Sequence, residues 1–161
     1  MTSYCTLKTA LAGDLLLTAN ATQLTGVYFS DCEHAPAIEE DWEPNPRHAV
    51  LRQAGDELHD YLWGKRTRFS LPLFAAGTDF QKEIWRQIAM VPFGETISYS
   101  ELARRAGVPR AIRAAGTATG KNPLSIIVPC HRVLGKHGML GGYAGGLDRK
   151  KRLLEVESLL F

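Results

Sequence analysis

A cysteine and a histidine stand side by side at the end of an apolar run, in the stretch IIVPCHRV at residues 126–133. One interpretation is structural, because cysteine is among the residue types most often buried and Cys130 could simply fill the core. The other is chemical: the apolar run aims a thiol, and the basic neighbours favour its thiolate, which is the reactive form. These eight residues alone leave both interpretations open.

Composition sets the class of protein in which such a thiol would work. The chain has 161 residues, 45% hydrophobic and 22% charged, as in a soluble globular protein. Its start, MTSYCTLK, lacks the features of a signal peptide, and no apolar run is long enough to span a bilayer. The three cysteines are odd in number, widely spaced and without a CxxC pair, so neither a disulfide framework nor a zinc ribbon is indicated. We therefore expect a cytoplasmic protein with no membrane partner.

The net charge of +2 conceals a separation of charge along the chain. Residues 1–63 contain ten acidic and three basic residues, whereas residues 102–152 contain eleven basic residues and one acid, Asp148. A basic half is typical of a surface that meets a polyanion, most often nucleic acid, although a merely solvated basic face would look the same. We place the boundary near an AAG stretch, which predicts two domains, residues 1–75 and residues 76–161.

The elements of the first half predict a small α/β unit. After a polar loop, apolar residues recur at helical spacing within residues 47–64, and Gly64 is placed to end that helix. Residues 68–74 could add a strand, at a sheet edge because of Pro72. Before them come three short β-like runs, separated by AGD and ATQ as in an antiparallel meander: residues 4–10, 14–20 and 24–30.

The second half is mostly helical. A T-x-x-Q capping box at Thr78 begins a helix that ends before Pro92, and an S-x-x-E box at Ser98 begins another, with Gly107 just past its end. Pro109 occupies a first-turn position and opens a third helix, PRAIRAAGTATG. Two short helices joined by a tight turn with glycine are typical of a helix-turn-helix, although plain packing of helices gives the same pattern.

The third of these helices is nearly bare, with Arg110 and Arg113 as its only long side chains. Reading base edges in the major groove needs several Arg, Asn or Gln side chains. A bare helix with one inward arginine fits better a wedge that enters a groove, so specific gene regulation is the less favoured use. The small residues that leave the helix bare are Ala111, Ala114, Ala115, Gly116, Ala118 and Gly120.

Taken together, the blocks of the last eighty residues resemble one family. PCHRV after an NP turn, SYSELARRAG and GYAGGLDRKKRLLEVE resemble the methylated-DNA–protein-cysteine methyltransferases, also called O6-alkylguanine-DNA alkyltransferases. The resemblance runs from about Phe80 to Glu157, and the first half agrees in outline with that family's N-terminal domain. It implies an α/β fold: a small ribonuclease-H-like domain of antiparallel sheet plus helix, then a mostly helical domain with a helix-turn-helix.

The resemblance also implies catalytic roles for five residues. Cys130 matches the alkyl acceptor, and His131 matches the residue that activates it through a bound water. Glu157 matches the acid that orients the histidine, and Asn122 the residue that braces the turn around the site. Tyr99 matches the tyrosine whose hydroxyl contacts the flipped guanine and assists its departure.

A DNA surface and a guanine pocket follow from the same resemblance. Arg113 matches the arginine that enters the base stack where the guanine has left. The other residues expected at the DNA are Tyr99, Arg110, Ala111, Gly116 and Thr119. Those expected around the guanine pocket are Val133, Tyr143, Ala144 and Lys150.

The implied reaction needs these residue types. Displacing an alkyl group from an aryl ether oxygen requires a soft, strong nucleophile, which a thiolate is and a hydroxyl is not. A Cys–His–Glu relay supplies the base and holds its tautomer, while Tyr99 and a backbone N–H can stabilise the departing guanine oxyanion. The target atom lies inside the duplex, so the base must be rotated out. Water does not cleave a thioether, so each molecule would act once.

Two features depart from the family pattern. Ala144 stands where many members have a serine, which removes a hydroxyl and can shift the tolerance of bulky alkyl groups. Some members bind a structural zinc in the N-terminal domain, but beside Cys5 this chain has Asn20 and Thr25 about where further ligands would fall. We therefore expect no metal, and the resemblance implies no cofactor.

The implied function is repair of O6-alkylguanine in double-stranded DNA by a monomer, with activity on O4-alkylthymine left open. Two alternatives have other classes of function. One is a relative that only binds alkylated DNA, and such relatives lack the cysteine. The other is a helix-turn-helix regulator, for which no effector domain is visible. A cysteine hydrolase is a third and weaker alternative, since it would need turnover.

Overall fold

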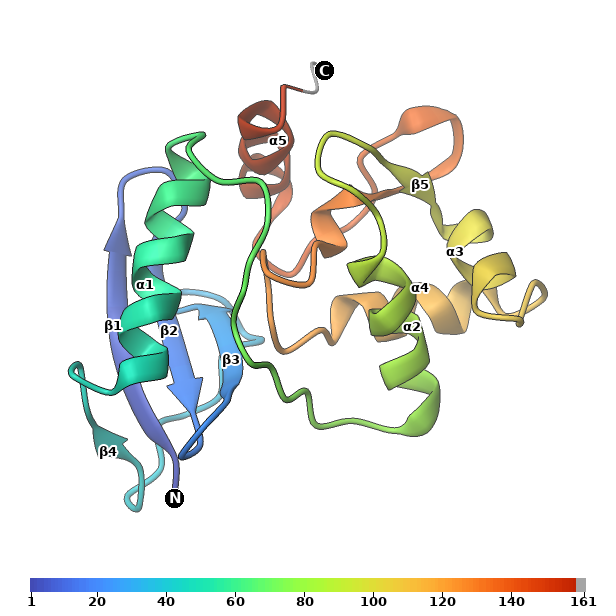
Figure 1. Cartoon of the computed structure of the whole chain (residues 1–161). Coiled ribbons are helices and arrows are strands. Elements are labelled where there is room, and N and C mark those ends of the chain that lie inside the picture. The colour runs from blue at the N-terminus through green and yellow to red at the C-terminus, as the bar shows by residue number, and fades with distance from the viewer. Residues whose placement is uncertain (159–161) are drawn as a thin grey trace.

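An α/β part and a helical part lie side by side in the computed structural model, which describes residues 1–158 (Figure 1). The end of the predicted C-terminal domain, residues 159–161, lies outside the described residues. The segment between α1 (Ala49–Leu62) and α2 (Asp79–Ala89) crosses from one part to the other. The last helix, α5 (Leu147–Val156), returns to pack against α1.

The N-terminal sheet has the order β3-β2-β1-β4. Its first three strands are antiparallel neighbours, which confirms the predicted meander. The fourth is a two-residue strand parallel to β1, inside a segment that the sequence indicates only as a polar loop. The predicted helix is also confirmed, and Gly64 follows it with a φ of 74°. The strands are β1 (Ser3–Thr9), β2 (Gly13–Ala19), β3 (Leu24–Phe29) and β4 (Glu43–Pro44).

The strand predicted at residues 68–74 is wrong. The segment makes only an isolated bridge between Leu73 and Leu24. Pro72 has no N–H to extend the ladder, and the N–H of Ser70 instead donates to the buried carboxylate of Glu57 at 2.8 Å. The segment therefore runs as an extended connection tied to α1 and to the end of the sheet.

The helical part contains the predicted helix pair. Thr78 and Gln81 form the reciprocal capping box of α2. Ser98 caps the next helix, but the Glu101 carboxylate receives Arg104 and Arg105 instead of completing a box. The elements are α2, β5 (Ile97–Ser98), α3 (Tyr99–Arg105), α4 (Ile112–Gly120), the 3-10 turns η1 (Cys130–Arg132) and η2 (Lys136–Gly138), β6 (Val133–Leu134) and α5.

The start of α4 differs from the prediction. Gly107 follows α3 with a φ of 77°, as expected. Pro109 does not open a helix, because the N–H of Ala111 donates to the carbonyl of Val108 at 2.8 Å and closes a turn around Pro109 and Arg110. Since proline also favours the second position of a turn, the helix begins only at Ile112.

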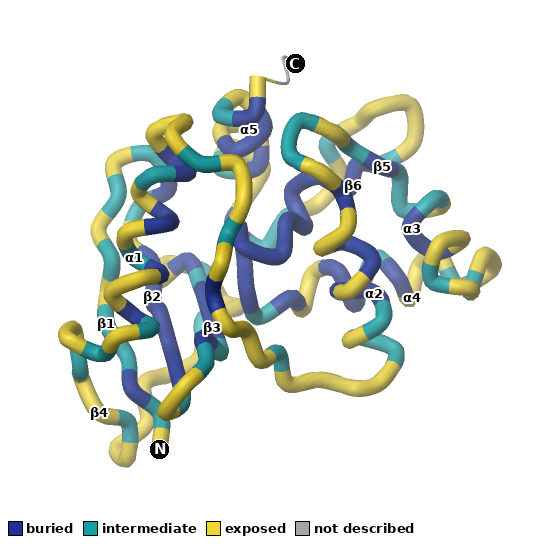
Figure 2. The backbone as a smooth tube through the Cα atoms, viewed as in Figure 1, coloured by how far each residue is buried: buried dark blue, intermediate teal, exposed yellow. Residues whose placement is uncertain are grey.

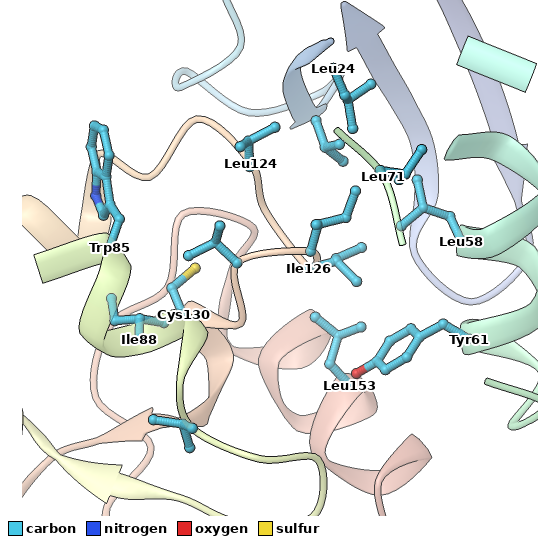
Figure 3. Packing of buried hydrophobic residues seen from close by; sticks show 14 of the residues in the cluster. Leu24, Leu58, Tyr61, Leu71, Trp85, Ile88, Leu124, Ile126, Cys130 and Leu153 are labelled. Atoms are coloured by element: carbon cyan, nitrogen blue, oxygen red, sulfur yellow. The ribbon is translucent and has the colours of Figure 1, made fainter. Parts of the chain in front are cut away.

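One buried core joins the two parts (Figures 2 and 3). Leu24 and Leu58 from the α/β part and Ile126 from the segment before Cys130 belong to the same cluster. A backbone connection accompanies this packing: the N–H of Val27 donates to the carbonyl of Pro123, and the N–H of Ser125 donates to the carbonyl of Val27. The segment that leads to Cys130 is therefore anchored on the edge of the N-terminal sheet.

Candidate active site

Cys130 lies at the floor of a cavity of about 480 Å³, with only 4% of the residue exposed. The segment before it turns sharply at Ile126, whose φ of 72° is rare for a β-branched residue and costs about 1–3 kcal/mol. Packing against the fully buried Ile126 side chain holds this turn, which carries Cys130 into η1. The cavity is also lined by Tyr99, Ile112, Gly116, Thr119 and Gly120, and by Gly142, Tyr143 and Ala144.

Behind Cys130, His131 and Glu157 form a fully buried pair. The Nε2 atom of His131 lies 2.7 Å from Oε2 of Glu157, and neither side chain is exposed. Glu157 follows the last turn of α5, so this final part of the described chain closes the back of the site. The other ring nitrogen of His131, Nδ1, has no hydrogen-bond partner among residues 1–158.

The charges of this pair fix the direction of its hydrogen bond. Burial favours the protonated form of Glu157, but hydrogen bonds from His131, Arg132 and Tyr61 hold its pKa at about 2. Burial lowers the pKa of His131 although Glu157 opposes this, so the imidazole is neutral near pH 7. A neutral ring facing a carboxylate donates from Nε2, which leaves Nδ1 as a proton acceptor.

Burial opposes the thiolate form of Cys130, which corrects part of the sequence interpretation. Burial raises its pKa, although Asn122 and Lys150 favour the charged form. The neighbouring Arg132 does not stabilise the thiolate, because its guanidinium donates to Glu157 at 2.8 Å and to the carbonyl of Val91 at 2.6 Å. A base must therefore remove the proton when the cysteine reacts.

Asn122 joins the two ends of the turn before Cys130. Its side-chain amide donates to the carbonyl of Val128 at 2.8 Å, and its oxygen accepts from the N–H of Leu124 at 2.9 Å. Both bonds are buried. The expected bracing geometry is therefore present at this position.

The four residues expected around the guanine pocket divide into two pairs. Tyr143 and Ala144 line the cavity. Val133 and Lys150 are completely buried and lie outside its lining. The Lys150 ammonium donates to the carbonyls of Val133, Gly142 and Leu140, so it holds the loop that carries Tyr143 from behind.

The residues expected at the DNA are also divided. Tyr99, at the start of α3, and Gly116 line the cavity side by side, since a Cβ on Gly116 would lie 3.7 Å from the Tyr99 ring. Thr119 also borders the cavity, but its hydroxyl donates to the carbonyl of Ala115. Arg113 is exposed and borders a different hollow, beside α2, so its side chain does not point into the cavity of Cys130. The remaining two, Arg110 and Ala111, lie in the turn before α4.

Three residues of the site were not singled out from the sequence. Tyr61 of α1 donates to Oε2 of Glu157 at 2.5 Å and lies 3.2 Å from Nε2 of His131. Arg132 holds both oxygens of Glu157. Ile112 stands at the cavity lining with 42% of the residue exposed. Ile112 had a sequence signal, as a large apolar residue on an otherwise bare helix, and Arg132 had one only as a basic neighbour of Cys130.

Two other kinds of feature are absent from residues 1–158. Within this range, no group of three or more His, Cys, Asp or Glu side chains is arranged to hold a metal ion. No helix in the same range is long and apolar enough to cross a membrane.

The fold and the site together define a class of two-part proteins in which a buried cysteine, backed by a histidine–glutamate pair, lies beside a helix-turn-helix. Residues 3–75 match the model of the 6-O-methylguanine DNA methyltransferase ribonuclease-like domain, and residues 79–159 match that of the corresponding DNA-binding domain. The chain belongs to the O6-methylguanine DNA methyltransferase family. The resemblance and the fold class inferred from the sequence are thereby confirmed.

Individual relatives are similar over nearly the whole chain. A methylated-DNA–protein-cysteine methyltransferase of Methanosarcina barkeri is 43% identical over 145 residues, covering 90% of each chain. Its counterpart in Mycobacterium tuberculosis is 41% identical over 157 residues, or 98% of this chain and 93% of the relative. The crystal structure of Mycobacterium tuberculosis OGT in complex with DNA matches with a TM-score of 0.89 at 40% identity, covering 98% and 94% of the two chains.

Proposed function

We propose that this protein repairs O6-alkylguanine in double-stranded DNA by transferring the alkyl group to Cys130 in a single turnover. The observation that carries the proposal is the position of a buried thiol at the floor of a cavity, with a neutral histidine and a carboxylate directly behind it. Family membership supports the reaction class, since the relatives named above are methyltransferases of this kind.

The proton path starts at the thiol. Nδ1 of His131 accepts the proton of Cys130 through a water molecule, and Glu157 stabilises the imidazolium that results. The thiolate then forms a bond to the alkyl carbon as the bond from that carbon to guanine O6 breaks. The electron pair of the broken bond stays on the purine, which takes up a proton from Tyr99 while the His131 imidazolium gives up the proton it took from the thiol, through water, to replace it. The products are a thioether and an unmodified guanine.

The departing purine needs a donor, and Tyr99 supplies one. Burial raises the pKa of the Tyr99 phenol, so its hydroxyl keeps a proton to donate. Tyr143 and Ala144 give the cavity its opposite wall. The rigid turn braced by Asn122 keeps Cys130 aimed between these walls.

The helix-turn-helix gives the protein its approach to the duplex. Gly116 and its small neighbours on α4 let the backbone come close to a groove at the mouth of the cavity, and Arg113 fills the gap left by the flipped base. The DNA surface also includes Arg110, Ala111 and Thr119. We further propose that the protein acts as a monomer in the cytoplasm, with neither metal nor cofactor.

Mass analysis of the Cys130 peptide after incubation with O6-methylguanine duplex tests the proposal. We expect one methyl group per molecule, on Cys130, and no second turnover when duplex is in excess. Cys130→Ala should bind the duplex with little change and transfer nothing. Methyl transfer by that variant, or repeated turnover by the wild type, contradicts the mechanism, and binding without transfer by the wild type would favour the binding-only alternative.

A further inference from the structure

The side chain of Tyr61 crosses from the N-terminal part to the back of the reaction site. It lies on α1, is completely buried, and points towards α5 (Figure 3). Its ring is held between Phe69 and Phe93, at centroid distances of 5.5 and 6.2 Å. Its position in the amphipathic helix would be filled equally well by phenylalanine if packing were its whole role.

The hydroxyl of Tyr61 has partners only in the histidine–glutamate pair, among residues 1–158. It donates to Oε2 of Glu157 at 2.5 Å and lies 3.2 Å from Nε2 of His131. The same carboxylate accepts from Nε2 of His131, from Nε and Nη2 of Arg132 and from the N–H of Gly94. A buried hydroxyl is costly unless it is bonded, and here its bonding is directed to the groups that would take the thiol proton.

We infer that Tyr61 is a positioning residue for alkyl transfer, through which the N-terminal part fixes the geometry and the basicity of the His131–Glu157 pair. This inference rests on the proposed function. By donating to Oε2, Tyr61 holds the carboxylate in the orientation that receives Nε2–H, which keeps Nδ1 as the acceptor. It also disperses part of the carboxylate charge and so limits how strongly Glu157 raises the basicity of His131.

Charged and titratable groups from its own turn and from other elements face His131. Besides Tyr61 on α1, they are Lys150 on α5, Glu157 at the end of α5, Cys130 and Arg132 on η1, and Tyr143 in the loop before α5. Arg132 and Lys150 disfavour protonation of the ring, whereas Glu157 favours it. Removing the Tyr61 hydroxyl leaves all these groups in place, ends its contact with Nε2 of His131 and restores charge to the Glu157 carboxylate, so the pKa of His131 should rise.

The test substitutes Tyr61→Phe in the full chain and measures two rates against pH. One is alkylation of Cys130 by iodoacetamide, and the other is transfer from free O6-benzylguanine, which needs no DNA. We expect transfer at neutral pH to slow roughly tenfold, as for loss of a bond to a charged group. We also expect the acidic limb of both profiles to move to higher pH, because the base is neutral only at higher pH.

Two controls separate positioning from packing. Tyr28→Phe removes a half-buried phenol of β3 outside the relay and should change neither profile. In a double-mutant cycle, Tyr61→Phe should add little to Glu157→Gln, because its effect passes through that carboxylate. Lower thermal stability with unmoved pH profiles, or full additivity with Glu157→Gln, would overturn the inference.

Misfolding of the variant and failure of the proposed function can each be distinguished from failure of the inference about Tyr61. If Tyr61→Phe does not fold, 3-fluorotyrosine placed at position 61 keeps the shape and makes a stronger donor, so both profiles should move to lower pH. Unchanged pH profiles in the 3-fluorotyrosine protein contradict the inference. If the wild type transfers nothing from alkylguanine, the proposed function fails, whereas the iodoacetamide profile still decides whether Tyr61 controls the relay.

Discussion

The guanidinium of Arg149 on α5 donates two parallel hydrogen bonds, of 2.8 and 2.9 Å, to the carboxylate of Asp31 at the end of the N-terminal sheet. The guanidinium also lies over the ring of Phe29, 4.9 Å from its centroid, and Phe29 in turn packs edge-on against Tyr143 of the cavity wall. The pair therefore connects the sheet with both the last helix and the loop that covers Cys130. It is a further connection between the two parts, separate from that of Tyr61 and from the backbone bonds of Val27.

Arg149→Met should loosen this connection and lower the melting temperature. The Arg149 guanidinium holds the pKa of Asp31 at about 2. A lowered carboxyl pKa stabilises the fold above its ordinary pKa near 4, and that stability is lost as the pH falls towards 2. The melting temperatures of wild type and variant should therefore converge in acid. Lys151→Met, an exposed neighbour on the same helix, is the matched control, and a gap that persists at low pH would contradict the argument.

Glu157→Gln should both destabilise the protein and slow the reaction of the Cys130 thiol. Arg132 would lose the carboxylate that neutralises it in the core, which costs about 3 kcal/mol for a buried ion pair. His131 would lose the charge that favours its protonation, so Cys130 should react more slowly with iodoacetamide at neutral pH. Denaturant unfolding and the pH profile of alkylation measure the two effects. An unchanged profile in the folded variant would remove Glu157 from the relay.

The sequence predicted the elements whose cause is local. The β-like runs, the helix ended by Gly64 and the Thr78 capping box follow from alternation, helical spacing and backbone caps within a few residues. Two predictions failed, the helix start at Pro109 and the strand at residues 68–74, because a proline fits several local structures. At Pro109 the local bond from Ala111 to Val108 decides among them, and in residues 68–74 the tertiary bond from Ser70 to Glu57 does so.

The site was predicted from a resemblance, and its supporting residues were missed for a physical reason. Tyr61 is an ordinary member of an apolar helix face, and Arg132 reads as a cation that would stabilise a thiolate. Their actual roles depend on Glu157, which is 96 residues from Tyr61 in the chain and adjacent in space. No local pattern encodes a contact over that separation.

Ile112→Ala should widen the range of alkyl groups that the cavity admits. Ile112 is the bulkiest exposed apolar residue on α4 within the cavity lining, and its truncation leaves Cys130 and its relay untouched. We expect the ratio of benzyl to methyl transfer rates to rise roughly tenfold, since a single methylene in a hydrophobic pocket changes discrimination by roughly 10–200-fold. Ile38→Ala, a similarly exposed isoleucine away from the cavity, is the control. An unchanged ratio would place Ile112 outside the path of the substrate.

The last prediction separates base flipping from chemistry, and it concerns Arg113. The side chain is exposed on α4, beside small residues that permit close approach to a duplex, and it does not enter the cavity of Cys130. If it fills the gap left by the extruded guanine, its removal costs part of the few kcal/mol that flipping requires. At about 1.4 kcal/mol per decade, Arg113→Ala should slow repair of duplex roughly tenfold or more.

A free O6-alkylguanine base needs no flipping, so its reaction with Cys130 should be nearly unchanged in Arg113→Ala. The decisive measurement is the single-turnover rate at saturating duplex, where a mere loss of affinity no longer counts. Arg110→Ala, in the turn before α4, serves as the control: if Arg110 contacts only phosphate, its removal should weaken binding of the duplex but leave the saturated rate intact. Equal losses on duplex and free base in Arg113→Ala would mean that Arg113 supports the fold or the thiol, and the wedge role would have to be abandoned.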